Sequence, residues 1–311
     1  MTRVFVFEFT SSSPIASADA LGAALNAEGQ AMRAAALADF ACIPGVESFT
    51  IDPTADEEAA FRAAARAADW SLVIAPEFDD ILLNRCRWVH EENGKLLGPS
   101  PETVRLCGDK LALANHWNAQ GVPTPPTFAI DESSSPPDPA WIVKPRFGAG
   151  SQDTSVNGPL RPGGQFGPMI VQPFITGQAA SVAFLSGPRQ RLALPATEQL
   201  LSSDGRFHYL GGRLPLPEAR ASRAVAIARQ AIQTIPNLHG YVGVDVLLGD
   251  DGRDWAIEIN PRLTTSYIGL RAFAATNLAE AMLRIAEGND PPPLRWRNGT
   301  VQFTASGQKF C

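Results

Sequence analysis

The stretch AIEINPRLTTSYIGL, residues 256–270, decides the fold of this chain. Residues 256–260 alternate along the chain like a β-strand with one buried face, yet the second face carries an acid, Glu258, and an amide, Asn260. The strand stops at a proline and is followed at once by Arg262. A mostly apolar strand that presents an acid, an amide and a guanidinium together indicates a binding site.

The preceding segment, YVGVDVLL at residues 241–248, predicts a second strand, and Asp251-Gly252 between the two is typical of a two-residue type I′ hairpin turn. With this turn, Asp250 faces Arg253. One face of the predicted hairpin is apolar and pairs Val244 with Ile259, Val246 with Ile257, and Leu248 with Trp255. The other face pairs Asp245 with Glu258, and Gly243 with Asn260.

Two acidic residues directly opposite each other have Cβ atoms about 5 Å apart, and their carboxylates repel. A slip of one residue would separate them but would turn the apolar face away from the core, so burial of that face holds the two acids together. The oxygens of Asp245, Glu258 and Asn260 are hard ligands that suit Mg²⁺, with Mn²⁺ as an alternative. A metal ion next to Arg262 is typical of a phosphate site. The competing interpretation is a solvated hairpin whose acids face water.

The composition favours an enzyme that acts on small molecules. The chain has 311 residues, 45% of them hydrophobic, and a net charge of -6, which argues against a nucleic-acid partner. Its four scattered cysteines, without a C-x-x-C pair, predict neither disulfides nor a zinc site and fit a cytoplasmic location. We find no signal peptide and no apolar run of membrane-spanning length, so no membrane partner is expected.

The order of predicted elements divides the chain into three parts. Strands at 4–9, 46–51 and 71–75 alternate with helices at 19–40 and 56–68, which predicts a doubly wound parallel-sheet domain over residues 1–100. A helix at 103–120 and strands at 141–145, 170–174 and 179–185 predict a small antiparallel domain over 101–185. The part at 186–311 holds a helix at 218–235, the hairpin, a helix at 276–287 and a strand near 300–304. The fold class is α/β with mixed α+β parts.

Two lysines and a glycine-bearing loop have the chemistry of a phosphate site. Lys144 ends the strand at 141–145 and precedes PRFGAGSQD, where glycines free the backbone to close over a phosphate. Lys110 opens a helical segment. Neither a Walker A motif nor a dinucleotide fingerprint is present, and a single lysine at a strand end is more often simply solvated.

Taken in order, these segments resemble the ATP-grasp superfamily of carboxylate-amine ligases. The matching stretches are GDK at 108–110, IVKPRFGAGSQD at 142–153, IVQPFITGQAASVAFL at 170–185, GVDVLL at 243–248 and EINPR at 258–262. The resemblance implies an ATP-grasp fold, in which two α+β subdomains hold ATP behind the N-terminal domain. It also implies ATP and Mg²⁺ as ligands, and makes a homodimer plausible.

By this resemblance, Asp245, Glu258 and Asn260 bind the metal, and Arg262 and Lys144 act in catalysis. Arg262 would stabilise the transferred phosphoryl group. The residues that would bind ATP are Lys110, Lys144, Gly148, Ala149, Gly150, Ser151, Gln172, Pro173, Phe174, Ile175 and Gln178. Two positions depart from the family pattern: Gln172 stands where many relatives have glutamate, and residues 178–180 lack the carboxylate that commonly contacts ribose.

Within the superfamily, VFVFEFTSSS, AEGQAMRAAALADF, IAPEFDDIL and NPRLTTSYIGL resemble the tyramine–glutamate ligases of methanofuran biosynthesis. That resemblance implies that ATP phosphorylates the γ-carboxylate of L-glutamate and that tyramine attacks the acyl phosphate. Thr264, Thr265, Ser266 and Tyr267 would then lie near the substrate. The alternatives are another acid and amine, as in a peptide-forming or D-alanine-type ligase, and a catalytically silent ATP-binding module.

Overall fold

The N-terminal part is a parallel sheet with helices on both faces, as predicted. The computed structural model describes residues 1–12, 20–136, 139–148, 150–165 and 167–310. Strands β1 (Thr2–Glu8), β2 (Val46–Phe49) and β3 (Trp70–Ile74) pair in parallel in the order β2-β1-β3. The helices of this part are α1 (Phe9–Ser12), α2 (Ala20–Ala41), α3 (Glu57–Ala67) and α4 (Ile81–Glu91), the last preceded by the 3₁₀ turn Phe78–Asp80. Asp19, the expected start of α2, lies outside the described residues.

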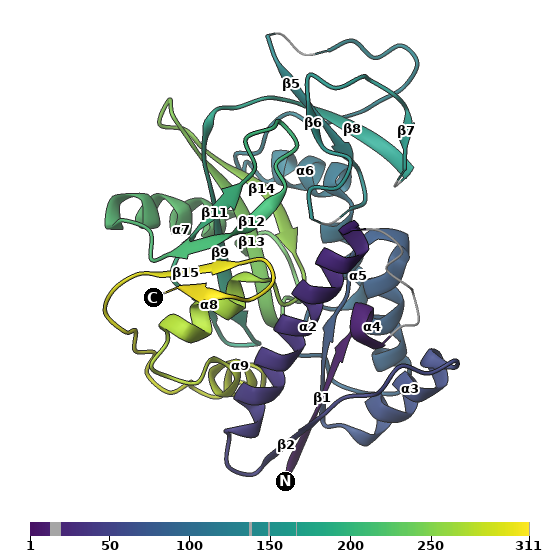
Figure 1. The fold of residues 1–311 in the computed structure, drawn as a ribbon, viewed down its shortest axis with the longest axis vertical. Helices are drawn as coiled ribbons and strands as arrows, with labels where there is room; N and C mark the ends of the chain where they lie inside the picture. Colours follow the sequence, from purple (N-terminus) through teal and green to yellow (C-terminus); the bar gives the residue numbers. More distant parts are fainter. Residues whose placement is uncertain (13–19, 137–138, 149, 166, 311) are drawn as a thin grey trace.

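The two faces of β1 serve different cores because successive side chains of a strand point to opposite sides. Phe5 and Phe7 pack with Phe61 of α3 and the apolar side of α4. Val4 and Val6 pack against α2 and, beyond it, the C-terminal helices α8 (Ser266–Phe273) and α9 (Leu278–Ala286). Helix α2 therefore joins the N-terminal sheet to the C-terminal part of the chain (Figure 1).

The helix expected at 103–120 is two helices, α5 (Pro101–Gly108) and α6 (Lys110–Ala119). Asp109 separates them in an extended conformation, and its side chain accepts hydrogen bonds from the backbone N–H groups of Leu111 and Ala112, each 3.1 Å long. An aspartate is a strong helix N-cap, so a new helix starts there. The break brings Lys110 to the first turn of α6.

A small antiparallel sheet forms the upper lobe in Figure 1. It consists of β4 (Phe128–Ala129), β5 (Trp141–Pro145), β6 (Ser155–Val156), β7 (Gly163–Gly164) and β8 (Gly167–Pro173), with β8 between β4 and β5. Val143 and Val171 lie in its own small core. Lys144, the next residue along β5, therefore points to the opposite side.

The large sheet has the order β14-β13-β9-β11-β12-β15-β16, and β10 also pairs with β9. Its strands are β9 (Gly177–Ser186), β10 (Arg191–Ala193), β11 (Thr197–Leu201), β12 (Tyr209–Leu214), β13 (Gly240–Gly249), β14 (Asp254–Asn260), β15 (Val301–Thr304) and β16 (Lys309–Phe310). The prediction that 179–185 belongs to the small sheet is wrong, because β9 pairs along its whole length with β13. The boundaries at residues 100 and 185 stay a prediction.

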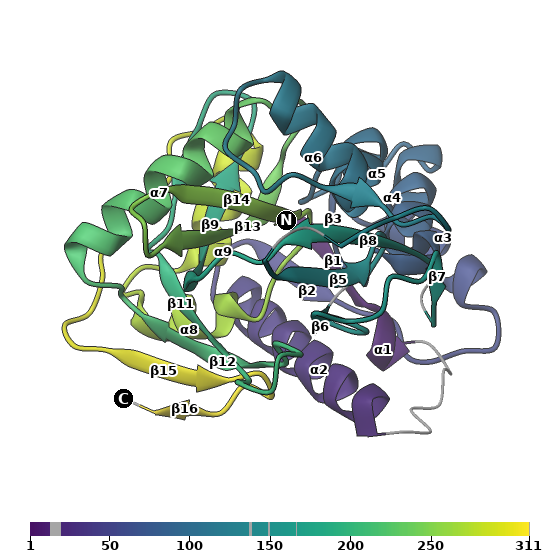
Figure 2. The same ribbon diagram turned by 90° about the horizontal axis from the view of Figure 1, so that it is seen from above.

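Helix α7 (Glu218–Gln233) covers one face of the large sheet, with Val182, Val244 and Ile259 in the shared core. Helices α8 and α9 cover part of the other face. The rest of that face lies opposite the small sheet, with α2 along its side (Figure 2). The binding cavity lies in this space.

Candidate active site

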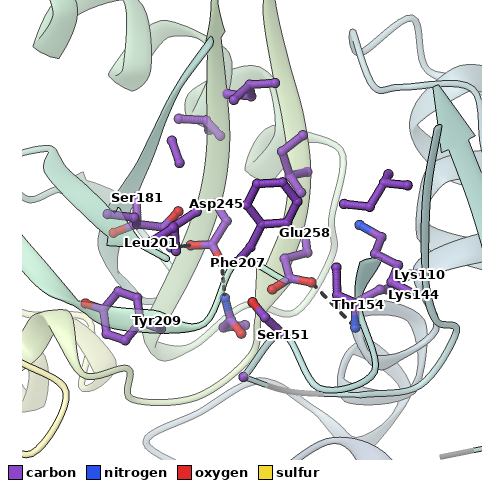
Figure 3. Close-up of a pocket in the computed structure, with 18 of the residues that line it drawn as sticks. Lys110, Lys144, Ser151, Thr154, Ser181, Leu201, Phe207, Tyr209, Asp245 and Glu258 are labelled. Carbon is purple, nitrogen blue, oxygen red and sulfur yellow. Dashed lines mark hydrogen bonds and ion pairs between the residues drawn. The ribbon is translucent and has the colours of Figure 1, made fainter. Parts of the chain in front are cut away.

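A cavity of about 590 Å³ separates the small sheet from the β13–β14 hairpin, a size suited to a nucleotide-sized ligand. The small sheet and the glycine-bearing loop form one wall, and the large sheet forms the other (Figure 3). Of the predicted site residues, those that line it are Lys110, Lys144, Gly148, Gly150, Ser151, Gln172, Pro173, Phe174, Ile175, Asp245, Glu258, Asn260, Arg262, Thr264, Thr265 and Ser266. Ala149 lies outside the described residues.

The hairpin brings the two acids together as predicted. Asp245 is paired with Glu258, and Gly243 with Asn260, and both carboxylates line the cavity. Asp245 accepts hydrogen bonds from Asn260 Nδ2 and Gln199 Nε2, each 3.1 Å long. Burial and the adjacent Glu258 carboxylate raise the pKa of Asp245 to about 8. Ionising both acids therefore costs free energy unless a cation lies beside them.

The predicted turn of the hairpin is wrong, although the acid pair is right. Gly249 donates a backbone hydrogen bond to Arg253, so the loop has three residues, Asp250 to Gly252, and Gly252 takes the left-handed conformation at φ 85°. This shifts the register by one, and the predicted pairs Val246–Ile257 and Leu248–Trp255 do not form. Val246 pairs with Ala256 and Leu248 with Asp254.

A bulge in β14 cancels the shift. The register changes between Asp245 and Val246, which leaves Ile257 as the extra residue. Ile257 and Glu258 then both line the cavity, while Ala256 and Ile259 on either side of them are buried in the core under α7. The apolar face still determines where the acids point, but through a turn and a bulge rather than through a regular ladder.

Two lysines face the acids across the cavity. Lys110 Nζ lies 3.5 Å from Glu258 Oε2 and donates a 2.6 Å hydrogen bond to the carbonyl of Gly148. Lys144 is 8% exposed, and burial, with Lys110 adding to the effect, lowers its pKa to about 8. Burial alone would raise the pKa of Glu258, but Lys110 and Lys144 outweigh it and hold that pKa below its usual value. The two acids and the two lysines thus stabilise each other's charged forms.

The loop after Lys144 is anchored at its base and lies along the cavity. Arg146 forms a two-pronged ion pair with Asp109, at 2.7 and 2.6 Å. Gly150 and Ser151 then adopt left-handed conformations at φ 68° and 58°, which turns the backbone toward the cavity. Such a loop presents backbone N–H groups to a phosphate.

The end of β8 and the segment after it line the far end of the cavity, at Gln172 to Ile175. Gln172 is 4% exposed and donates a 2.7 Å hydrogen bond to Thr127 Oγ1. Phe174 stacks on Phe207, with ring centroids 6.1 Å apart. Aromatic side chains with a few polar groups beside them suit a purine base.

Gln178 does not belong to this cavity wall. Ala179 and Ser181 of β9 line the cavity, so Gln178 lies on the alternate face, toward the core that contains Ala180. Its Nε2 donates a 2.9 Å hydrogen bond to Glu198 of β11. The prediction that Gln178 contacts ATP is therefore not supported by its position in the strand.

Arg262 lines the cavity and is held by Glu77, which follows β3 in the N-terminal part. Arg262 Nε lies 2.9 Å from Glu77 Oε1, and its NH2 donates to Glu77 Oε2 at 3.2 Å. Burial would lower the pKa of Arg262, but Glu77 outweighs that effect and raises it. Asp79 and Asp80, just after Glu77, are both left-handed, at φ 52° and 54°, an uncommon conformation for residues other than glycine.

Of the predicted substrate residues, Thr264, Thr265 and Ser266 line the cavity, whereas Tyr267 lies in the core. Tyr267 is fully buried, and its hydroxyl donates a 2.7 Å hydrogen bond to Asp39 of α2. The reason is that α8 starts at Ser266, so the next residue turns toward the packed side of a helix.

Several cavity residues were not identified from the sequence: Glu28, Thr154, Ser181, Gln199, Leu201, Phe207 and Tyr209. Most of them lie on β9, on β11 or in the segment from β11 to β12. The segment TEQLL at 197–201 runs from three polar residues into two leucines without alternating, so it gives no local signal of which side chains face the cavity. Glu28 gives no such signal either, because only the docking of α2 brings it to the cavity.

Two absences within the residues that the structure describes bear on the site and its setting. No three or more His, Cys, Asp or Glu side chains there are arranged to hold a metal ion, so an ion at the acid pair would need the amide of Asn260 or other oxygens as well. In the same part of the chain, no helix has the length and apolar character needed to cross a bilayer.

The comparisons with known proteins agree with this geometry. Residues 107–266 match the model of an ATP-grasp domain, and residues 31–104 match a pre ATP-grasp 3 domain. The chain belongs to the ATP-grasp family. It is 30% identical over 242 residues to a tyramine–L-glutamate ligase of Methanocaldococcus jannaschii, covering 78% of this chain and 67% of that one. The corresponding ligase of Methanocaldococcus fervens is 27% identical, with 78% and 71% covered.

Solved structures show the same ATP-grasp fold. An ATP-grasp superfamily protein from Archaeoglobus fulgidus superposes with a TM-score of 0.72 at 22% identity, covering 98% of this chain and 92% of that chain. A carboxyaminoimidazole ribonucleotide synthase of Aspergillus clavatus, complexed with ATP, has a TM-score of 0.71 at 15% identity, with 97% and 81% covered. This ATP-grasp protein is an ATP-binding ligase that forms a carbon–nitrogen bond from a carboxylate and an amine.

Proposed function

We propose that this ATP-grasp ligase joins the γ-carboxylate of L-glutamate to tyramine with release of ADP and phosphate. The observation that carries the ligase chemistry is the approach of Lys110 to Glu258, 3.5 Å apart, where a cationic wall meets an acidic one inside a single cavity. The choice of glutamate and tyramine is supported by the two Methanocaldococcus ligases that the chain resembles.

The reaction needs no nucleophile from the protein. A carboxylate oxygen of glutamate attacks the γ-phosphorus of ATP, the bond to the β-phosphate oxygen breaks, and ADP leaves. The amine then attacks the carbonyl carbon of the acyl phosphate, inorganic phosphate leaves, and the nitrogen loses a proton. Catalysis is therefore a matter of positioning and of neutralising charge on the phosphates.

The residues of the cavity fit these tasks. Lys110 and Lys144 would bind ATP phosphates, with the backbone of residues 148–151 closing over them. Gln172 to Ile175 would hold the adenine against Phe174 and Phe207. Arg262, oriented by Glu77, would stabilise the phosphoryl group during transfer. Thr264, Thr265 and Ser266 would contact the substrate.

The acid pair fits a divalent cation. Burial and the adjacent Glu258 carboxylate raise the pKa of Asp245 to about 8, so a positive ion would replace the proton that the pair otherwise retains. Asp245, Glu258 and Asn260 would bind Mg²⁺ or Mn²⁺ through oxygen atoms. When bound, the ion would neutralise the phosphate oxygens of ATP.

A phosphate-release assay with ATP, Mg²⁺, L-glutamate and a panel of amines tests the proposal. We expect ADP and phosphate to form only when an acid and an amine are both present, with tyramine the best amine and γ-glutamyltyramide identified by mass spectrometry. Turnover only with a different acid or amine would support the ligase chemistry but overturn the assignment of glutamate and tyramine as substrates. ATP binding without turnover on any pair would instead support a silent ATP-binding module.

A further inference from the structure

Glu28 gives the cavity an acidic group away from the metal site. It lies in the middle of α2, is half-buried, and lines the cavity together with Arg262 and residues 264–266. The hydroxyl of Thr265 donates a hydrogen bond to its Oε1 across 237 positions of the chain. This carboxylate thus faces the segment that follows the metal strand, although it belongs to the N-terminal part.

The charge around Glu28 is not balanced by a paired cation. Glu258 has Lys110 at 3.5 Å, and Arg262 is already held in a two-pronged pair by Glu77. Among the residues that the structure describes, Glu28 accepts its hydrogen bond from the neutral Thr265. Burial raises the pKa of Glu28, the hydrogen bond from Thr265 and the charge of Arg262 oppose this, and the charge of Glu8 adds to it. Among the described residues, the carboxylate of Glu28 thus has no cation in direct contact with it, and a charged group of a ligand would supply one.

Glu8 does not share that role, because its carboxylate is already used. It is 2% exposed and accepts hydrogen bonds from the backbone N–H groups of Thr10 and Ser11, at 3.0 and 2.8 Å, and from both hydroxyls. These bonds tie Glu8 to the turn after β1. Glu28, with its single neutral partner, is the carboxylate left for a ligand.

The position of Glu28 is set by close packing of α2. A Cβ placed on Gly29 would lie 2.3 Å from Glu8 Oε1 and 2.7 Å from Thr10 Oγ1, so only a glycine lets the helix approach β1 this closely. On its other side α2 is tied to α8 by Asp39, which accepts from Tyr267 and Arg271. A side chain on so fixed a helix is a suitable anchor for a charged group.

We propose that Glu28 binds the α-ammonium group of the amino-acid substrate, and so selects an amino acid over a plain carboxylic acid. The inference rests on the proposed function and adds to it the residue that reads the ammonium group. The attacking amine is a poorer fit, since it must lose its proton to react and a carboxylate partner would favour its charged, unreactive form. The α-ammonium of glutamate stays charged throughout the reaction.

The test compares L-glutamate with glutarate, which has the same two carboxylates but no ammonium group. With ATP, Mg²⁺ and hydroxylamine, which captures the acyl phosphate as a hydroxamate, kcat/KM is measured for both acids in the wild type and in Glu28→Gln. The glutamine keeps the size of the side chain and an oxygen for Thr265. We expect kcat/KM of the wild type to be at least ~10-fold higher for glutamate than for glutarate. In the variant, kcat/KM for glutamate alone should fall ~10- to 100-fold. Glutarate should be unaffected, because it has no group for Glu28 to bind.

The outcomes separate the two proposals. If the wild type forms no hydroxamate from either acid, the proposed glutamate chemistry is overturned, and the role of Glu28, which depends on it, is overturned with it. The role of Glu28 is overturned if the wild type is active but Glu28→Gln keeps the full preference for glutamate. It is also overturned if the variant's kcat/KM falls equally for glutamate and glutarate. A change confined to the KM of tyramine in the complete reaction would also overturn it. Gln30→Ala, an exposed change on the same helix, should leave every constant unchanged, and the Kd of ATP verifies that the variants are folded.

Discussion

The acidic wall of the cavity comes from one hairpin, whereas the cationic wall comes from a helix and a strand in different parts of the fold. Asp245 and Glu258 are adjacent because the apolar face of β13–β14 places them there. Lys110 and Lys144 meet only because Asp109 breaks a helix and the small sheet folds over the large one. The register of one hairpin thus determines the acidic wall. Tertiary packing forms the cationic wall and places it opposite the acidic one.

The largest effect should come from the acidic wall. Glu258→Gln removes one charge from the acid pair and from the partner of Lys110, and we expect turnover to fall ~100-fold or more, about 3 kcal/mol in the barrier. ADP release under saturating substrates measures it. Asp251→Asn, in the exposed turn of the same hairpin, is the control and should leave turnover intact. Normal turnover in a folded Glu258→Gln protein would show that the hairpin does not contribute to catalysis.

The next effect tests whether a distant segment orients Arg262, for which we propose a role in phosphoryl transfer. Glu77→Gln leaves Arg262 in the cavity wall without its charged partner, and we expect kcat to fall ~30-fold and stability by about 2 kcal/mol. The KM of ATP should change little, which separates a role in transfer from a role in nucleotide binding. Steady-state kinetics and urea unfolding measure the two quantities. Loss of stability with unaltered kcat would make the Glu77–Arg262 pair purely structural.

The cationic wall should show itself in the pH dependence of ATP binding. The pKa of Lys144 lies near 8 rather than at 10.5, so its ammonium group loses its proton as the pH rises through 8. We expect ATP to bind wild-type protein ~10-fold more weakly at about pH 9 than at about pH 7 in EDTA. Lys144→Met should bind ATP ~10-fold more weakly at the lower pH and lose the part of this dependence that comes from the ammonium group, keeping the part that comes from Asp245, whose pKa is also about 8. Lys144→Arg, which stays charged, is the control, and calorimetric titration gives the Kd values.

The smallest effect concerns the turn that sets the hairpin. Gly252→Ala forces a left-handed conformation on alanine at φ 85°, with no atom within 4 Å to clash, so the cost should be the backbone term of about 1 kcal/mol. Gly98→Ala also meets open space but lacks the positive φ, and it should cost less. Denaturant midpoints give the comparison. Equal midpoints for the two variants would contradict the three-residue loop.

Much of the acidic wall was readable from the sequence because a strand has a period of two residues and its buried face cannot be exchanged with its exposed one. The pairing of Asp245 with Glu258 was predicted from a two-residue turn that the structure does not have, whereas the alternation of 241–248 and 255–260 by itself placed both acids on one face. The alternation was not enough to show the turn or the bulge at Ile257, since a shift at one and its reversal at the other leave the same acids opposed. The parallel pairing of β1 to β3 was predicted from the alternation of strands with helices along the chain, and the order β2-β1-β3 came from the structure.

What the sequence left undetermined depends on contacts between distant segments. The pattern of β9 predicts a strand but does not say which sheet it joins, and that choice turned Gln178 away from the cavity. Nothing near Glu77 in the chain indicates Arg262, which follows 185 positions later. Likewise, Tyr267 lies in the core rather than in the cavity because α8 starts at Ser266.

The sequence by itself determined the class of chemistry: a repelling acid pair held by an apolar face, an arginine after it, and lysines with a glycine-bearing loop elsewhere in the chain. Only the tertiary structure decided which side chains share the cavity, because docking of α2, the small sheet and the large sheet brings together groups with no common local pattern. Periodicity records which face of an element is buried, whereas a cavity is defined by the elements that surround it.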